Sequence, residues 1–192
     1  MEEGAIKLSV LDKILAKIFL PIFPRWIRPN HLTTIRVILT PLVVWLFWIE
    51  SYFKGGILFL FTSFTDALDG AMARSRNQIT EFGKIYDPLA DKILICSVVY
   101  ILVLKYVDFY AAWIVIVLEA IIIAAALIKK SRGHCAVQAN VWGKIKMNLQ
   151  VLGVVILLLS ILLNIEQLLP VSKGTFYLAI AFGILSLFTY SI

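Results

Sequence analysis

The feature of this sequence that most constrains its fold is a group of four aspartates at helical spacings in a strongly apolar chain. They belong to the run Asp66-x2-Asp69-Gly70-x2-Ala73-Arg74-x8-Gly83-x3-Asp87-x3-Asp91. Hydrophobic residues make up 61% of the 192 residues, well above the share in soluble domains. An aspartate at the centre of a membrane helix costs about 2.5–3.5 kcal/mol on insertion scales. The group must therefore lie near a membrane surface, line an aqueous cavity or bind cations.

The apolar residues gather in six stretches that approach the length of a membrane span. They are Arg36–Ile49, Gly56–Met72, Ile85–Leu104, Phe109–Ile128, Met147–Leu163 and Thr175–Ile192. The connections are short, and no period-two pattern of a barrel occurs. The sequence therefore predicts an all-α membrane protein in which residues 30–192 form one domain of six transmembrane helices.

Residues 1–29 predict a cytoplasmic amphipathic helix that lies on the membrane surface. Leucine and isoleucine recur at steps of three and four from Leu8 to Ile22, opposite Lys13 and Lys17. An ordinary helix packed on the bundle remains the alternative. The segment lacks the uninterrupted apolar core and the cleavage site of a signal peptide.

Basic residues are distributed unevenly between the two sides of the predicted spans. The three on the far side are Lys54, Lys105 and Lys173. The thirteen on the side of the N-terminus are Lys7, Lys13, Lys17, Arg25, Arg28, Arg74, Arg76, Lys84, Lys129, Lys130, Arg132, Lys144 and Lys146. Cytoplasmic connections are enriched in basic residues, so the N-terminus and the aspartate group are predicted to face the cytoplasm.

The aspartates form two pairs with the chemistry of a metal site. Asp66 and Asp69 lie about one turn apart on one predicted helix. Asp87 and Asp91 have the same relation on the next helix. A short connection would bring the two acidic faces together. Because hard carboxylate oxygens suit Mg²⁺ or Mn²⁺, the pattern indicates a site for two such ions.

Small residues and an arginine accompany these acids. Gly70, Ala73 and Gly83 leave room for a bulky ligand or a close helix approach. Arg74 supplies a planar, permanent charge suited to phosphate. Two metals beside an arginine are the apparatus of phosphoryl or phosphatidyl transfer. Two other interpretations stay open, namely the ion pathway of a membrane cation transporter and structural bridges to Arg74, Lys84 and Lys92.

The run DALDGAMARSRNQITEFGKIYDPLAD resembles, at every defining position, the signature of the CDP-alcohol phosphotransferase (phosphatidyltransferase) family. Six membrane helices and an amphipathic N-terminal helix are also that family's plan. The resemblance implies that an alcohol displaces CMP from a CDP-linked lipid, with two divalent ions as cofactors. It implies that Asp66, Asp69 and Asp87 hold metal, and that Asp91 completes the second metal's shell and acts as general base. It assigns CDP binding to Asp66, Asp69, Gly70, Ala73, Arg74 and Gly83.

Further residues look like those of the phosphatidylglycerophosphate synthases within that family. Thr33 and Arg36 precede or open the first span, and Lys144 and Lys146 precede the fifth. The resemblance implies that these four bind the phosphate of an acceptor, glycerol 3-phosphate. Cations at the cytoplasmic face are physically suited to a dianion. The alternative is that they anchor the chain to anionic lipid headgroups.

Two departures from that subfamily keep the acceptor open. Leu118 precedes Glu119 where an arginine is usual, and Ala126 stands where a second arginine would fall. Inositol phosphate, or phosphatidylglycerol giving cardiolipin, are alternative acceptors. Glu119 lies deep in an apolar stretch and needs a partner, for which a basic residue of the active cavity is predicted.

The resemblance also suggests partners and a location. The donor is CDP-diacylglycerol or a related CDP-lipid, the acceptor is a small phosphorylated polyol, and no nucleic-acid partner is expected. Relatives are homodimers, so a homodimer surrounded by membrane lipids is predicted. The location is a prokaryotic cell membrane or an organelle inner membrane, with the active site facing the cytoplasm.

Overall fold

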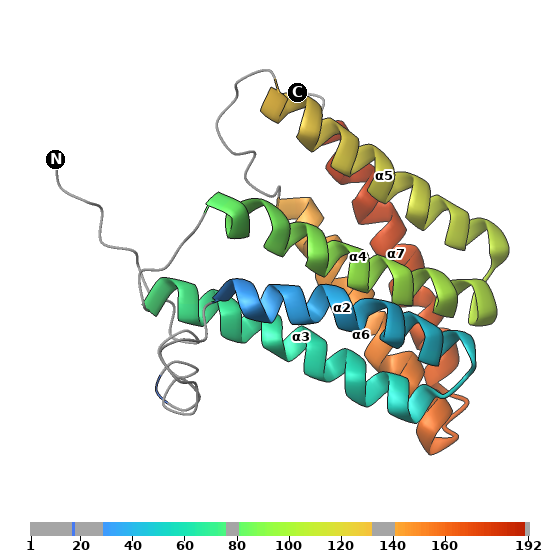
Figure 1. The fold of residues 1–192 in the computed structure, drawn as a ribbon. Helices are drawn as coiled ribbons and strands as arrows, with labels where there is room; N and C mark the ends of the chain where they lie inside the picture. Colours follow the sequence, from blue (N-terminus) through green and yellow to red (C-terminus); the bar gives the residue numbers. More distant parts are fainter. Residues whose placement is uncertain (1–16, 18–28, 76–80, 132–140, 191–192) are drawn as a thin grey trace, which may run out of the picture. The chain divides into compact units, whose positions relative to one another are not determined.

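The computed structural model describes residue 17 and residues 29–75, 81–131 and 141–190, which form helices and turns without a strand (Figure 1). The helices are α2 (Pro29–Trp48), α3 (Tyr52–Ser75), α4 (Glu81–Tyr106), α5 (Phe109–Ser131), α6 (Val141–Leu163) and α7 (Leu168–Tyr190). This confirms the all-α prediction. The shortest has 20 residues, and at 1.5 Å per residue that is about the thickness of a bilayer core.

Four helices in the described ranges are long and apolar enough to cross a membrane. Their spans are His31–Trp48, Tyr52–Ala73, Val141–Leu163 and Leu168–Thr189, and α5 adds a shorter apolar segment, Phe109–Ala125. The membrane class agrees with the sequence analysis, whereas the count of six spans remains a prediction. The predicted N-terminal amphipathic helix lies outside the described residues, apart from Lys17.

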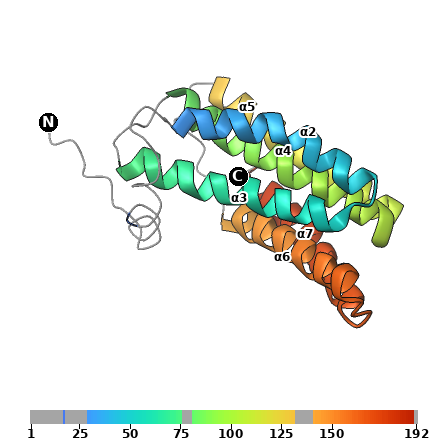
Figure 2. The same cartoon turned by 60° about the horizontal axis from the view of Figure 1, so that its bottom comes forward.

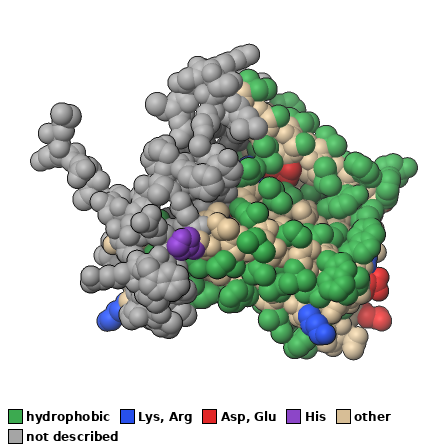
Figure 3. All heavy atoms as spheres, viewed as in Figure 1, with side chains coloured by type: hydrophobic (Ala, Val, Ile, Leu, Met, Phe, Trp, Pro, Cys, Tyr) green, Lys and Arg blue, Asp and Glu red, His purple; other side chains and the backbone are tan. Residues whose placement is uncertain are grey.

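The surface agrees with contact to lipid. Large hydrophobic side chains are exposed on every described helix, among them Ile38, Leu60, Ile93, Trp113, Leu159 and Phe188. On the face drawn in Figure 3, apolar side chains cover most of the described surface. A soluble protein rarely exposes so large an apolar area.

Five of the six described helices begin before the apolar stretches that predicted them. α2 begins at Pro29, although the apolar stretch starts at Arg36. Proline suits the first helical position because its missing N–H would have no partner there. α6 likewise includes Lys144 and Lys146, whose charges lower the local hydropathy without opposing the helix. Hydropathy therefore located the spans but not their ends.

Two turns have a residue in the left-handed conformation just after a helix ends. Glu50 follows α2 with a φ of 62°, and Asn164 follows α6 with a φ of 54°. In the first turn, the Ser51 N–H donates to the Leu46 carbonyl at 2.9 Å, which closes the helix end. A left-handed glutamate is unfavourable. The Lys105 ammonium compensates by donating to Glu50 Oε1 at 3.0 Å.

The chain divides into two compact units. The first unit comprises Met1–Trp45 and Lys54–Leu94, and the second comprises Leu46–Phe53 and Ile95–Ile192. The first unit thus holds most of α2 and α3 with the start of α4. The second unit holds the rest of α4 and all of α5, α6 and α7.

Within the second unit, α6 and α7 lie side by side (Figures 1 and 2). Gly153 of α6 permits the close approach. A Cβ at this position would lie 2.8 Å from the Phe176 ring and 2.9 Å from Thr175 Oγ1. The buried Ser172 hydroxyl donates to the Gly153 carbonyl at 2.9 Å. A small residue and a serine thus bring two apolar helices together, as is common in membrane bundles.

Substitution of Gly153 tests this contact. We expect Gly153→Ala to lower the free energy of unfolding by about 1–3 kcal/mol, because the added methyl group meets a buried ring. Gly174→Ala on α7 is the matched control, since a Cβ there meets nothing within 4 Å. Thermal unfolding in detergent would measure both variants. Equal stability of the two variants would contradict the close approach.

Candidate functional site

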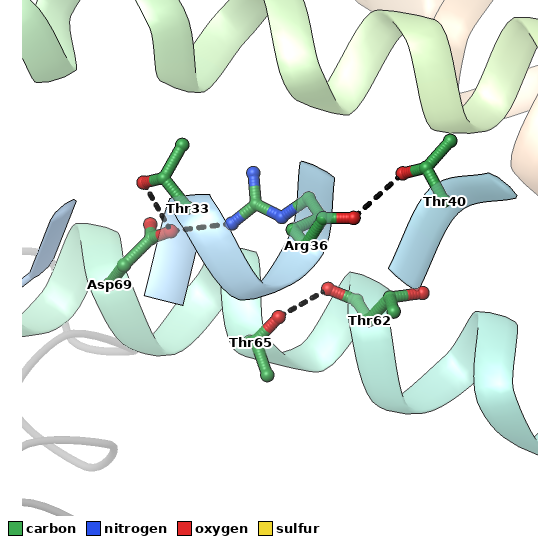
Figure 4. Close-up of polar contacts among 6 residues, drawn as sticks. All are labelled: Thr33, Arg36, Thr40, Thr62, Thr65 and Asp69. Carbon is green, nitrogen blue, oxygen red and sulfur yellow. Dashed lines mark hydrogen bonds and ion pairs between the residues drawn. The ribbon is translucent and has the colours of Figure 1, made fainter. Parts of the chain in front are cut away.

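The site in the first unit centres on Asp69 of α3, which meets two side chains of α2 (Figure 4). Arg36 Nη2 donates to Asp69 Oδ2 at 2.5 Å. Thr33 Oγ1 donates to the same oxygen at 3.4 Å. Three predicted site residues, assigned from separate motifs to metal and to the acceptor, are therefore brought together.

Helical periodicity places the polar side chains of α2 on one face of that helix, and those of α3 likewise. Thr33, Arg36 and Thr40 recur at steps of three and four on α2, and all three are buried. Thr40 Oγ1 donates to the Arg36 carbonyl at 2.8 Å. On α3, Thr65 Oγ1 donates to the Thr62 carbonyl at 2.7 Å. Thr40 and Thr65 thus satisfy their hydroxyls on their own helices.

Burial makes the ion pair sensitive to the loss of either partner. The exposed fractions of the Arg36 and Asp69 side chains are 0% and 2%. Removing two charges from water is expensive, and only their mutual attraction with further hydrogen bonds offsets that cost. A single substitution would leave the other charge buried without this compensation.

The other residues of the predicted metal and CDP sites are described only in part. Gly70 and Ala73 lie half-buried on α3, and Asp91 lies half-buried on α4. The surroundings of Asp66, Arg74, Gly83 and Asp87 are not described, so their predicted roles are untested. Among the side chains that are described, no three His, Cys, Asp or Glu residues gather as a metal site.

The described carboxylates fit the chemistry of a hard divalent cation. Asp69 accepts from a guanidinium and a hydroxyl, and both contacts favour its charged form. A charged carboxylate oxygen is the ligand that Mg²⁺ and Mn²⁺ prefer. Asp91, the second described member of the set, is accessible enough to meet a ligand.

A second polar cluster lies in the second unit, between α5 and α6. The Lys146 ammonium donates to Glu119 Oε1, and both side chains are buried. The prediction that Glu119 needs a basic partner is thus confirmed, and Lys146 is the partner, whereas its place in an active cavity stays a prediction. The other predicted lysine, Lys144, is exposed.

The buried polar residues Gln150 and Ser186 accompany this cluster and were not among the predicted site residues. Gln150 lines a small pocket together with Lys146. A Cβ on Gly143, one turn before Lys146, would lie 3.4 Å from Ser186 Oγ. Gln150 follows Lys146 by four residues, and this spacing on one helix face is the signal that could have found it.

Comparison with known proteins decides the family. A family model described as CDP-alcohol phosphatidyltransferase matches residues 26–185. The chain belongs to this family. The match covers both the aspartate signature and the segment that carries Glu119 and Lys146, so the two polar clusters lie within family sequence.

Similar proteins share one name, CDP-diacylglycerol–glycerol-3-phosphate 3-phosphatidyltransferase. The protein of Bacillus subtilis is 37% identical over 143 residues, which cover 73% of this chain and 72% of that protein. The protein of Wigglesworthia glossinidia brevipalpis is 32% identical over 174 residues, covering 85% and 86%. The protein of Rickettsia typhi is 41% identical over 80 residues, which span 40% of this chain and 45% of that protein's length.

Loss of the arginine in the first unit should destabilise the fold. We expect Arg36→Met to lower the free energy of unfolding by about 3–5 kcal/mol, because it leaves Asp69 buried without its counter-charge. The double variant Arg36→Met/Asp69→Asn should recover part of this loss. Thermal unfolding in detergent with EDTA would measure both, with the exposed substitution Ile38→Met as control. A double variant whose loss of stability equals or exceeds the sum of the two single losses would refute the coupling.

Proposed function

We propose that this protein synthesises phospholipid by transferring the phosphatidyl group of CDP-diacylglycerol to glycerol 3-phosphate, with release of CMP. The complete aspartate signature on α3 and α4 carries the proposal, in a chain whose family match spans residues 26–185. The names of the similar bacterial proteins support the choice of donor and acceptor.

The reaction is a single displacement at phosphorus. The acceptor hydroxyl oxygen bonds to the phosphorus that carries the lipid, and the bond from that phosphorus to the CMP oxygen breaks. Asp91 takes the hydroxyl proton, and CMP leaves with the electron pair of the broken bond. Asp91 is suited to this because it is half-buried, and a carboxylate beside the reacting hydroxyl can act as general base.

Two divalent ions, Mg²⁺ or Mn²⁺, belong to this proposal. Asp66, Asp69, Asp87 and Asp91 would hold them. When bound, such ions neutralise diphosphate charge and stabilise the leaving group. Arg36 and Thr33 fix the position of the Asp69 carboxylate by donating hydrogen bonds to its Oδ2.

Small residues and an arginine would bind the CDP group. Gly70 and Ala73 lie half-buried on α3 beside the buried Asp69. Their small side chains leave space against the helix for a diphosphate or ribose. Arg74 would supply a guanidinium to the phosphates, and Gly83 would keep the cavity open.

The acceptor phosphate would be bound by Thr33, Arg36, Lys144 and Lys146. Guanidinium, hydroxyl and ammonium donors together suit a phosphate dianion. Lys144 is exposed and can meet a soluble acceptor directly.

We infer that the aspartates and the start of α6 face the cytoplasm. The excess of basic residues on the side of the N-terminus supports this orientation. The turns at the opposite end carry exposed aromatic residues, among them Trp48, Phe53, Phe109 and Tyr110. Aromatic side chains are enriched where a membrane meets water, so these turns suit the outer interface.

Release of CMP tests the function directly. Purified protein with CDP-diacylglycerol and Mg²⁺ or Mn²⁺ should release CMP fastest when glycerol 3-phosphate is the acceptor, and EDTA should abolish the release. Inositol phosphate and phosphatidylglycerol complete the acceptor panel. Faster release with either one would replace the proposed acceptor, and no release with any of the three would refute the transferase.

Substitution of the proposed base tests the mechanism. Asp91→Asn should reduce turnover by about 10²–10⁴-fold, because the hydroxyl loses its proton acceptor, while binding of CDP-diacylglycerol persists. Asp108→Asn is the matched control, since Asp108 only caps α5 by accepting from the Ala111 N–H at 3.0 Å. Asparagine caps a helix equally well. A parallel loss of binding and turnover in Asp91→Asn would exclude the role of base.

Cysteine labelling tests the orientation. In a background with Cys96 and Cys135 replaced by serine, Glu50→Cys should react with a membrane-impermeant maleimide in intact cells. Val141→Cys should react only after the cells are permeabilised. Both positions are exposed, so accessibility within the protein is matched. The reverse pattern would invert the proposed topology.

A further inference from the structure

The two lysines at the start of α6 have different surroundings, although they lie two residues apart. Lys144 is exposed, whereas Lys146 is 5% exposed and reaches into the second unit. Its ammonium donates to Glu119 Oε1 of α5. A difference of this kind between neighbouring cations indicates that only Lys146 is held in one place.

The structure confines Lys146 along its whole length. A Cβ on Gly183 of α7 would lie 3.3 Å from Lys146 Cδ, so the stem of the lysine passes against the bare backbone there. The cavity beside it is lined by Val115, Leu118, Lys146, Gln150, Ala179 and Ile180. Residues of three helices therefore surround the aliphatic part of the Lys146 side chain. Glu119 accepts a hydrogen bond from its ammonium.

Glu119 is the acid that pairs with this lysine. Its Oε1 accepts from Lys146, whereas its Oε2 is buried without a hydrogen-bond partner in the described part of the chain. An ammonium carries three N–H donors, and Glu119 Oε1 accepts one of them. An acid so deep in an apolar bundle is costly unless it is paired or has a function.

We propose that Glu119 is a positioning residue that holds the Lys146 ammonium where it meets the phosphate of the acceptor. This inference rests on the proposed function, and it adds a residue to which neither the signature nor the acceptor motif assigns a role. The carboxylate does not touch the acceptor. It fixes a flexible side chain and balances its charge in a buried site.

A structural ion pair would behave differently in kinetics. Loss of a merely structural pair lowers stability and the amount of active enzyme, so the KM values of donor and acceptor stay unchanged. Loss of a positioning contact raises the KM of the phosphorylated acceptor alone. It does so only while Lys146 is present, because Glu119 acts through that residue.

The test is a double-substitution cycle on purified protein, measured by CMP release with CDP-diacylglycerol and glycerol 3-phosphate. Glu119→Gln should raise the KM of glycerol 3-phosphate about tenfold and leave the KM of CDP-diacylglycerol within about twofold. Lys146→Ala should raise the same KM. The double variant should be no worse than Lys146→Ala, because the two changes remove one interaction. Ser160→Ala, a buried change at the other end of α6, should leave both KM values unchanged.

The outcomes separate this inference from the proposed function. If the unsubstituted protein releases CMP but the two changes multiply, or both KM values rise together, the positioning role is wrong and the transferase stands. If the unsubstituted protein releases no CMP with glycerol 3-phosphate, the proposed function fails and the inference falls with it. Should Glu119→Gln not fold, Glu119→Asp keeps the charge but shortens its reach, and the same selective rise in KM is expected.

Discussion

Compensation of buried charge is the constraint on which the rest of this structure depends. An apolar helical bundle tolerates an ion only where an opposite charge meets it. Arg36 and Asp69 satisfy this condition between α2 and α3, and Lys146 and Glu119 satisfy it between α5 and α6. Each pair joins helices that follow one another in the chain. The register of each helix pair is thereby tied to residues for which chemical roles are also proposed.

Both pairs combine an acid with a cation that sequence motifs connect to the acceptor phosphate. Under the proposed function, a phosphate dianion at either cation would share that cation with a carboxylate. Such an arrangement favours a ligand with strong charge and several acceptor oxygens over a neutral alcohol. The charge of glycerol 3-phosphate suits this requirement.

Much of the fold follows from the sequence because the hydropathy of a segment indicates whether it contacts lipid and other helices or water. The apolar stretches located all six described helices. Their ends were missed where polar residues continue a helix, as at Pro29 of α2 and Lys144 of α6. Hydrogen bonding along the backbone sets those ends, and it does not depend on whether a side chain is apolar.

The candidate site was predictable within each helix but less so between helices. The spacing from Asp66 to Asp91 determines which acids share a helix face, and the cost of an isolated acid predicts that Glu119 has a basic partner. The partner of Asp69 did not follow in the same way. Arg74, Lys84 and Lys92 were all reasonable bridges, whereas Arg36 of α2 makes the contact. Periodicity gives the faces of single helices, and only the packing decides which faces meet.

The pairing of Glu119 with Lys146 has a consequence for the order of events at the ribosome. The chain is made from the N-terminus, so α5 emerges with its glutamate before α6 brings the lysine. Until then the acid has no counter-ion from α6, at a cost of a few kcal/mol if its helix is already in the bilayer. The other residues of α5 must therefore be apolar enough to offset the cost of the unpaired glutamate until α6 is made. The isoleucines, valines and alanines of α5 provide this hydrophobicity. The hydrophobicity of α5 thus serves its own insertion as well as the finished bundle.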